Sequence, residues 1–273
     1  MNSTVKQQLG LSMVELLIAL AISSFLILGI TQIYIDNKRN YLFQQTQAGN
    51  VENQRFLDLL MDNLLSKAAY RRGPKQKTEE IFNNIAATTD CQAFKKGQAI
   101  TPAKGGIGVC IRYFPLISGE LDCTGNQTPT FTDTNPFTPA FESGDPVLMV
   151  VRYKAATDLN GSLTCKVGTT EAELLTGIAD FRMTFGLSST PDRKIDRIVA
   201  FNNWTTSSGN IMQVSYAALM ANGQQARTSS ESKALTDWNL NASTAEKERI
   251  TAGDKGQVFQ IASNTTALRN QMP

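Results

Sequence analysis

The sequence contains no histidine. This absence excludes a histidine-based catalytic triad, a histidine general base and any metal site that needs an imidazole ligand. Carboxylate and lysine chemistry remain open, but the side chain that enzymes use most often for proton transfer is missing. We therefore expect a protein that is not an enzyme, with no cofactor and no bound metal.

A large net charge is also lacking, because 26 basic and 24 acidic side chains leave only +2 over 273 residues. Proteins that bind nucleic acid need a basic surface, since contacts to phosphate dominate their affinity. We therefore expect no direct nucleic-acid partner. The 41% hydrophobic content is ordinary for a globular chain and is enough for a substantial core.

Cysteines are few, and none of them forms a CxxC pair, which excludes zinc-ribbon and thioredoxin-like motifs by their spacing. The four are Cys91, Cys110, Cys123 and Cys165. An even number of cysteines behind an export-type N-terminus predicts two disulfides formed in an oxidising compartment. The residues alone leave all three pairings open.

One long hydrophobic run is present near the N-terminus, where residues 16–35 carry no charge. A helix of that length, at ~1.5 Å per residue, covers the ~30 Å hydrocarbon core of a bilayer. The run is longer than the ~7–15 apolar residues of a simple signal peptide, and no clean small-x-small cleavage site follows it. We expect a retained single-pass transmembrane helix over residues 11–35, with the N-terminus in the cytoplasm.

A single carboxylate, Glu15, stands directly before this run. An ionised acid at the centre of a bilayer costs ~2.5–3.5 kcal/mol or more, although at a helix start it gains from the positive end of the helix dipole. Two interpretations are equally supported by the residues alone. Glu15 either pairs with a free amine at the start of a neighbouring helix, as an assembly device, or stabilises only its own helix start.

Gly10, the hydrophobic Leu11, Glu15 and the apolar run together resemble the type III signal of type IV pilins and pseudopilins. The resemblance implies that residues 1–10 are a leader, and that prepilin peptidase cuts between Gly10 and Leu11 and methylates the new amine of Leu11. It also implies that Glu15 neutralises the terminal amine of a neighbouring subunit. Two departures are the leucine at the first mature position, commonly phenylalanine, and Gln32 where many major pilins have proline.

Residues 36–72 predict an amphipathic continuation of the helix. Gly49 and Asn50 mark a position for a kink, so one long helix and two helices with a hinge both fit, and Gly73 and Pro74 predict the end. The apolar stripe that we expect to face a core consists of Phe56, Leu57, Leu60, Leu64 and Ala68.

Residues 73–273 predict a globular, β-rich head, which gives an α+β fold: a long N-terminal helix packed on an antiparallel sheet. Asn160 and Gly161 predict a hairpin turn, and a short helix is expected at residues 245–250. Residues 124–146 and 224–257 predict two long loops. The expected strands are 146–155, 162–167, 179–185, 195–201, 211–220 and 258–262. In 179–185, apolar residues alternate with Asp180, Arg182 and Thr184, which predicts one exposed face.

Several segments are similar to the PilW type of minor pilin, namely 53–60, 69–71, 122–125, 163–165, 174–181 and 265–270. This resemblance implies a Cys123–Cys165 disulfide and leaves Cys91–Cys110. It implies a pilin-like fold and a structural role in type IV pilus assembly, in an initiation or tip complex. The partners implied are prepilin peptidase, other minor pilins, the major pilin, the inner-membrane assembly platform and a tip adhesin. The implied location is the inner membrane, with a periplasmic head, and then the filament at the cell surface.

Two alternatives share parts of this pattern. A J-type pseudopilin of a type II secretion system has the same N-terminal features. A membrane-tethered periplasmic binding protein has the anchor, but it needs a set of polar residues gathered in a pocket, which the sequence does not indicate.

Overall fold

The computed structural model describes residues 12–73, 76–131, 145–190, 194–227, 229 and 232–271. The expected leader and the expected cleavage position lie outside the described residues. The chain forms two compact units, Met1–Gln45 and Thr46–Pro273. The boundary between them, after Gln45, falls inside the first helix. It lies ten residues beyond residue 35, the expected end of the membrane segment.

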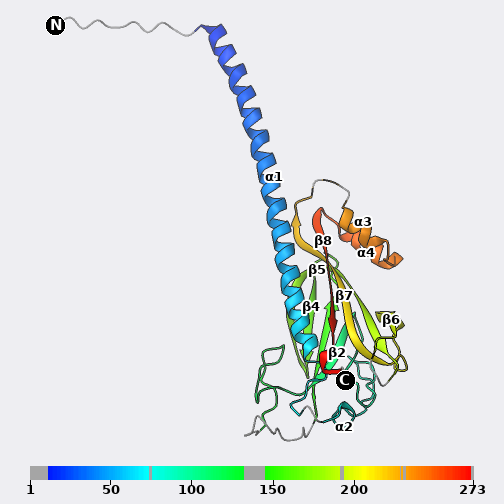
Figure 1. Ribbon diagram of the computed structural model, residues 1–273. Helices are drawn as coiled ribbons and strands as arrows, with labels where there is room; N and C mark the ends of the chain where they lie inside the picture. Colours follow the sequence, from blue (N-terminus) through cyan, green and yellow to red (C-terminus); the bar gives the residue numbers. More distant parts are fainter. Residues whose placement is uncertain are drawn as a thin grey trace, which may run out of the picture. The chain divides into compact units, whose positions relative to one another are not determined.

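The first helix, α1 (Met13–Ser66), is a single element (Figure 1). Gly49 and Asn50 therefore do not divide it into two helices. The buried apolar residues of its C-terminal part differ from the predicted stripe, because Phe56 is 48% exposed. Asn50 lies two turns before Leu57 on the same helix face and is hydrogen-bonded to the sheet, which sets the rotation of the helix. The buried set is Leu57, Met61, Leu64 and Leu65, and Ala68, just beyond the end of the helix, is buried as well.

Helix α1 ends at Ser66 rather than at residue 72. Ala69 adopts a positive φ of 61°, which is uncommon for a residue with a Cβ. Its N–H donates to the carbonyl of Arg112 at 3.1 Å, and the Tyr70 carbonyl accepts from the N–H of Phe114 at 3.0 Å. Pairing with the sheet thus ends the helix before the glycine-proline signal is reached.

Within the described residues, eight strands form one antiparallel sheet in the order β1-β2-β3-β4-β5-β7-β8, and β6 pairs with β5 off this path. The predicted α+β class, a long N-terminal helix with an antiparallel sheet, is confirmed. The strands are β1 (Ile100–Pro102), β2 (Gly108–Tyr113), β3 (Val147–Lys154), β4 (Gly161–Val167), β5 (Thr170–Ser188), β6 (Arg197–Ala200), β7 (Asn210–Gln225) and β8 (Gln257–Ala267). The remaining helices are α2 (Thr78–Ile81), α3 (Lys233–Asn239) and α4 (Thr244–Gly253), with short 3-10 turns at Phe201–Asn203 and Arg269–Gln271.

The predicted hairpin between residues 146–155 and 162–167 is confirmed as β3 and β4. Its turn differs from the prediction, because the residue with positive φ is Leu159, at 62°, and not Asn160 or Gly161. Gly161 instead begins β4, where a Cβ would lie 2.7 Å from the carbonyl oxygen of Ile178. The glycine is therefore needed for close approach of two strands and not for the turn.

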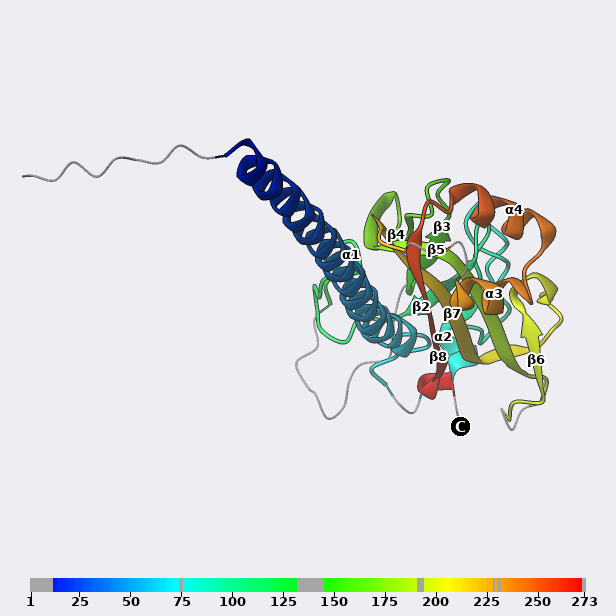
Figure 2. The same cartoon turned by 90° about the horizontal axis from the view of Figure 1, so that it is seen from above.

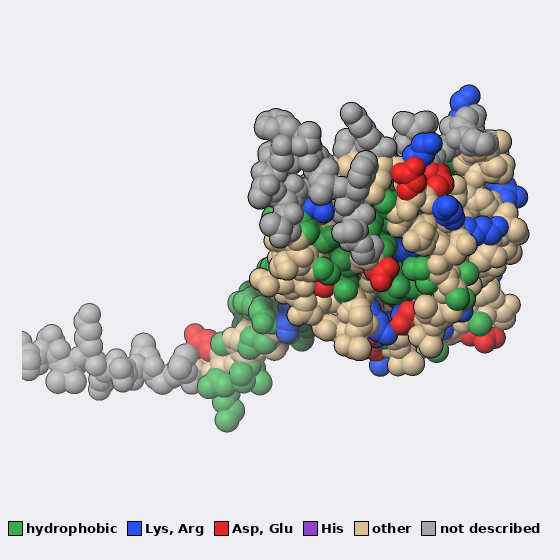
Figure 3. Space-filling view, turned by 90° about the horizontal axis from the view of Figure 1, so that it is seen from below, with side chains coloured by type: hydrophobic (Ala, Val, Ile, Leu, Met, Phe, Trp, Pro, Cys, Tyr) green, Lys and Arg blue, Asp and Glu red, His purple; other side chains and the backbone are tan. Residues whose placement is uncertain are grey.

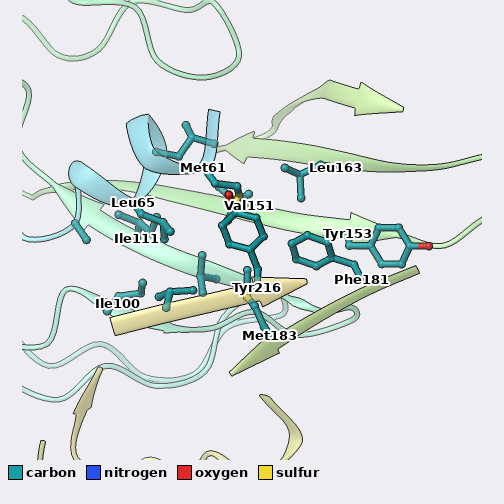
Figure 4. Packing of buried hydrophobic residues seen from close by; sticks show 14 of the residues in the cluster. Met61, Leu65, Ile100, Ile111, Val151, Tyr153, Leu163, Phe181, Met183 and Tyr216 are labelled. Carbon is teal, nitrogen blue, oxygen red and sulfur yellow. The ribbon is translucent and has the colours of Figure 1, made fainter. Parts of the chain in front are cut away.

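The main core lies between the C-terminal part of α1 and one face of the sheet (Figure 4). Met61 and Leu65 of α1 are fully buried in it. Phe181 stacks on Tyr216 with ring centroids 5.9 Å apart, and its centroid lies 5.8 Å from that of Tyr153. Burying each large apolar side chain contributes roughly 1.5–3 kcal/mol, so this layer holds the helix on the sheet.

The opposite face of the sheet is covered by α3 and α4 (Figure 2). Helix α4 confirms the short helix expected at residues 245–250. Asp180 was expected on an exposed face, but it is buried beneath these helices. The Trp238 Nε1–H donates to Asp180 at 2.8 Å, and Arg249 forms an ion pair with Asp180 at 2.6 Å. Burial raises the pKa of Asp180, and these two partners partly offset the rise.

Candidate assembly surface

Glu15 lies in the first turn of α1 and is exposed. Its Oε2 accepts the N–H of Ser12 at 3.2 Å, and the Ser12 hydroxyl accepts the N–H of Val14 at 3.3 Å. This reciprocal arrangement is close to a capping box and stabilises the helix start. A carboxylate accepts about four hydrogen bonds, so Glu15 can take a second donor from another molecule without losing its cap.

The first part of α1 presents a largely apolar surface. Among the described residues, α1 is the one helix long and apolar enough to cross a membrane, and the rest of the chain does not bury its apolar stretch. Figure 3 shows hydrophobic side chains gathered on this part of the helix. The large exposed side chains are Met13, Val14, Leu16, Leu17, Ile18, Leu20, Ile22, Phe25, Leu26, Ile27, Leu28, Ile30, Ile33, Tyr34 and Ile35. A helix with this length and surface could span a bilayer.

Asn50 joins the second part of α1 to the sheet and is fully buried. Its Nδ2 donates to the Val258 carbonyl of β8 at 2.7 Å, and its Oδ1 accepts from the Asn222 N–H of β7 at 2.9 Å. The β7–β8 ladder is irregular here, between Ala221 and Gln225. The amide of Asn50 therefore bridges the two strands where their own hydrogen bonds are interrupted.

Gly49 allows this close approach. A Cβ at Gly49 would lie 2.7 Å from the Asn222 Nδ2, so a larger residue would have to displace that side chain. The Gly49–Asn50 pair, read from the sequence as a place for a kink, is instead the point where the helix fastens to two strands.

Two further polar contacts continue along the same side of α1. The Gln260 Nε2 donates to Gln54 Oε1 at 2.7 Å, and the Tyr216 hydroxyl donates to Asp58 Oδ1 at 2.8 Å. Burial, the hydrogen bond to Asp58 and the charges of Asp58 and Asp62 all raise the pKa of Tyr216. Both carboxylates thus lie near the last two strands of the sheet.

The end of β8 is also fastened to the helix. Beyond this strand, the Asn270 Nδ2 donates to the carbonyls of Ser66 at 2.7 Å and Ala68 at 3.2 Å. Asn50 contacts the start of β8 and Ser66 contacts the segment after its end. The second part of α1 and strand β8 therefore run in the same direction, fastened together at both ends.

The structure joins Cys91 to Cys110 and Cys123 to Cys165, with Cα atoms 5.9 Å and 6.1 Å apart. This is the pairing that the PilW resemblance implies. The first bridge ties a loop to β2, and the second ties a loop to β4. No free cysteine remains.

A pocket of about 440 Å³ lies beside β3 and β4, and Asp90 is among the residues that line it. Asp90 forms ion pairs with Arg152 at 2.6 Å and Lys166 at 2.7 Å, which lower its pKa. All three charged side chains are thus engaged with one another, with two cations on one carboxylate. No cluster of three acidic or cysteine side chains suited to a metal occurs in the part of the chain that the structure describes.

The sequence predicted Glu15 and the four cysteines as site residues, and the structure pairs all four cysteines. Gly10 and Leu11 lie outside the described residues, and the assembly role of Glu15 stays a prediction. The residues that dock the helix, Asn50, Gln54 and Asp58, were not predicted from the sequence. Polar side chains on a predicted core-facing stretch were the available signal, but their partners lie far away in the sequence.

No family model matches the chain. No curated protein matches it significantly. Among solved structures, a type IV-like pilin from Thermus thermophilus aligns with it at 13% sequence identity and a TM-score of 0.39. The alignment covers 83% of this chain and 97% of that one.

Proposed function

We propose that this chain is a minor pilin of the PilW type that takes part in type IV pilus assembly, with a structural rather than a catalytic role. The observation that carries the proposal is the position of Glu15, five residues after Gly10 and directly before an apolar run. In the structure this run is exposed and belongs to the same helix that docks on the head.

In this proposal the chain is first inserted in the inner membrane and later incorporated in the filament. In the inner membrane, the apolar part of α1 spans the bilayer with the head in the periplasm, where the two disulfides form. Prepilin peptidase then cuts between Gly10 and Leu11 and methylates the amine of Leu11. In the filament, other pilin helices replace the lipid around α1.

Glu15 has a defined job in this proposal. The Glu15 carboxylate accepts a hydrogen bond from Ser12 of the same chain. It also attracts the positively charged terminal amine of a neighbouring subunit. Such a pair in apolar surroundings favours one axial register between helices, because the charge is unpaired in any other register. The partners proposed are other minor pilins, the major pilin, the assembly platform and a tip adhesin.

A J-type pseudopilin of a type II secretion system is the second candidate, because Glu15 and the apolar helix support it equally. The head segments that resemble the PilW type favour the minor pilin. Deleting the gene separates the two candidates, since loss of pili with normal enzyme secretion supports the minor pilin and the reverse supports the pseudopilin.

The first test is mass spectrometry of the N-terminus of membrane-extracted protein, from cells with and without prepilin peptidase. We expect a chain that begins at methylated Leu11 only when the peptidase is present. A chain that keeps Met1, or one cut beyond Ile30, would remove the basis of the proposal.

A further inference from the structure

The two edge strands of the sheet, β1 and β8, differ in length and in what lies against their outer edges. At one end, β1 is only three residues long. The segment before it lies against β1, because Cys91 bridges to Ala103 and the Gln92 N–H donates to the Pro102 carbonyl. At the other end, β8 is eleven residues long, and among the described residues no strand pairs with its outer edge.

The hydrogen bonds at the two ends of β8 show which backbone groups face outward. The Leu268 N–H donates to the Met212 carbonyl of the neighbouring chain segment, and the Val258 carbonyl points to the Asn50 bridge beside β7. Even-numbered residues of β8 therefore direct their backbone groups toward β7. Because backbone direction alternates along a strand, Ile261, Ser263 and Ala267 direct theirs toward the open edge.

Natural proteins protect such edges with lysine, proline, bulges or a covering segment. Strand β8, with the sequence QVFQIASNTTA, has no charged residue and no proline. The Thr265 N–H is the exception on the outer side, since it donates to the Asn264 Oδ1 at 2.7 Å. The short strand β6, by contrast, carries Arg197 on its four residues. The unprotected edge of β8 is thus suited to accept another strand.

The residues on the two sides of the sheet near β8 indicate which side chains an added strand should carry. On the α1 side, Asp58 and Asp62 lie near Tyr216, which pairs with Asn264 of β8. On the other side of the sheet, Ile261 is 37% exposed. Successive side chains of an added strand point to opposite sides, so one set would lie on the side of the sheet that carries the Asp58 and Asp62 carboxylates, and the other on the side of Ile261.

We propose that the outer edge of β8 binds an extended segment of another protein as an added β-strand, and that this segment carries Lys or Arg on the side that faces α1. Backbone hydrogen bonds supply affinity, and the alternating side chains supply specificity. The inference goes beyond the proposed function, because strand capture uses β8 and the second part of α1 and requires neither cleavage after Gly10 nor Glu15.

The test uses the full chain in a non-ionic detergent and a fluorescent peptide of about seven residues that alternates Val and Lys. We expect saturable binding of this peptide and no binding of a matched peptide that alternates Val and Glu. Ser263→Pro removes one outward N–H without touching the β7 ladder, and should weaken binding about tenfold or more. Ser263→Ala is the matched control and should bind as the unaltered chain does. Asp62→Lys should also weaken binding.

Equal binding of the Val–Lys peptide to the unaltered chain and to Ser263→Pro would overturn the proposal, as would no binding at all. A chain that is dimeric in detergent and becomes monomeric on Ser263→Pro would assign the edge to a second copy instead. Should Ser263→Pro fail to fold, amide exchange of the unaltered chain decides. Peptide binding should protect the amides of Ile261, Ser263 and Ala267 and leave Ala262 unchanged, whereas uniform or absent protection contradicts an added strand.

Discussion

At the scale of single residues, one substitution separates the capping contact of Glu15 from the pairing role proposed for its charge. Glu15→Gln retains an oxygen that accepts the Ser12 N–H, since glutamine also serves in a capping box, but it removes the negative charge. We expect normal membrane insertion and at least about a tenfold loss of filaments, because a charge-assisted pair contributes roughly 1.5–3 kcal/mol. Counting pili by electron microscopy measures this.

Glu52→Gln is the matched control, because it removes an exposed carboxylate elsewhere on the same helix and should leave filament number unchanged. If Glu15→Gln cells make as many pili as the parent strain, capping alone explains the acid, and a pairing role for its charge is wrong.

Asn50 is the residue on which docking of the helix depends most. Asn50→Ala leaves the Val258 carbonyl and the Asn222 N–H without their partner, at about 1–3 kcal/mol each when buried. We expect the free energy of unfolding, measured by denaturant titration of the full chain in detergent, to fall by about 2–4 kcal/mol.

Gln54→Ala serves as the comparison, because Gln54 is only half-buried whereas Asn50 is fully buried, and we expect a loss below about 1 kcal/mol. Similar losses for the two variants would mean that water satisfies the groups left by Asn50, and that the bridge is not the main attachment.

At the scale of elements, Asp90 ties the loop before β1 to β3 and β4. Its ion pairs lower its folded pKa below the ordinary value of about 3.9, so their contribution is present above about pH 4 and is lost as the pH falls through the folded pKa. We expect Asp90→Asn to lose about 1–2 kcal/mol at pH 7 and to approach the unaltered chain below pH 4. Urea unfolding across that pH range tests the trend, and a pH-independent difference would contradict it.

The elements also show what the sequence can and cannot predict. Alternation in residues 179–185 correctly indicated a strand, but α3 and α4, which follow much later in the chain, bury the face that carries Asp180. Strand β2 escaped detection because all six of its residues are buried and so show no alternation. The alternation placed Asp180 on a strand, on the face that carries polar residues. Only the tertiary arrangement determines that this residue is buried.

The candidate site divides in the same way. Glu15 could be proposed as a site residue because the other parts of the pattern, Gly10 and the apolar run, are its neighbours in the sequence. Asn50 could not, because its two partners are 172 and 208 residues away and lie at an irregular point of the ladder. Local periodicity carries no information about a bulge in a distant strand.

At the scale of the whole molecule, the two disulfides close loops of different length. Cys91 and Cys110 are 19 residues apart, and Cys123 and Cys165 are 42 apart. In the chain-entropy model, removing the first bridge as a double serine variant lowers the free energy of unfolding by about 3 kcal/mol, and removing the second by about 4 kcal/mol. Denaturant titrations of the two double variants give the order, and a larger loss for the shorter loop would show that native contacts outweigh chain entropy.

The parallel course of α1 and β8 has a mechanical consequence. Asn50 holds the start of β8 and Asn270, just beyond its end, holds Ser66, so a pull along the helix axis is applied to the strand lengthwise. A force along the strand shears β8 against β7, so all hydrogen bonds of the β7–β8 ladder are loaded at the same time. A strand peeled from one end would instead lose its bonds one after another. The head is therefore built to resist traction transmitted through its own helix.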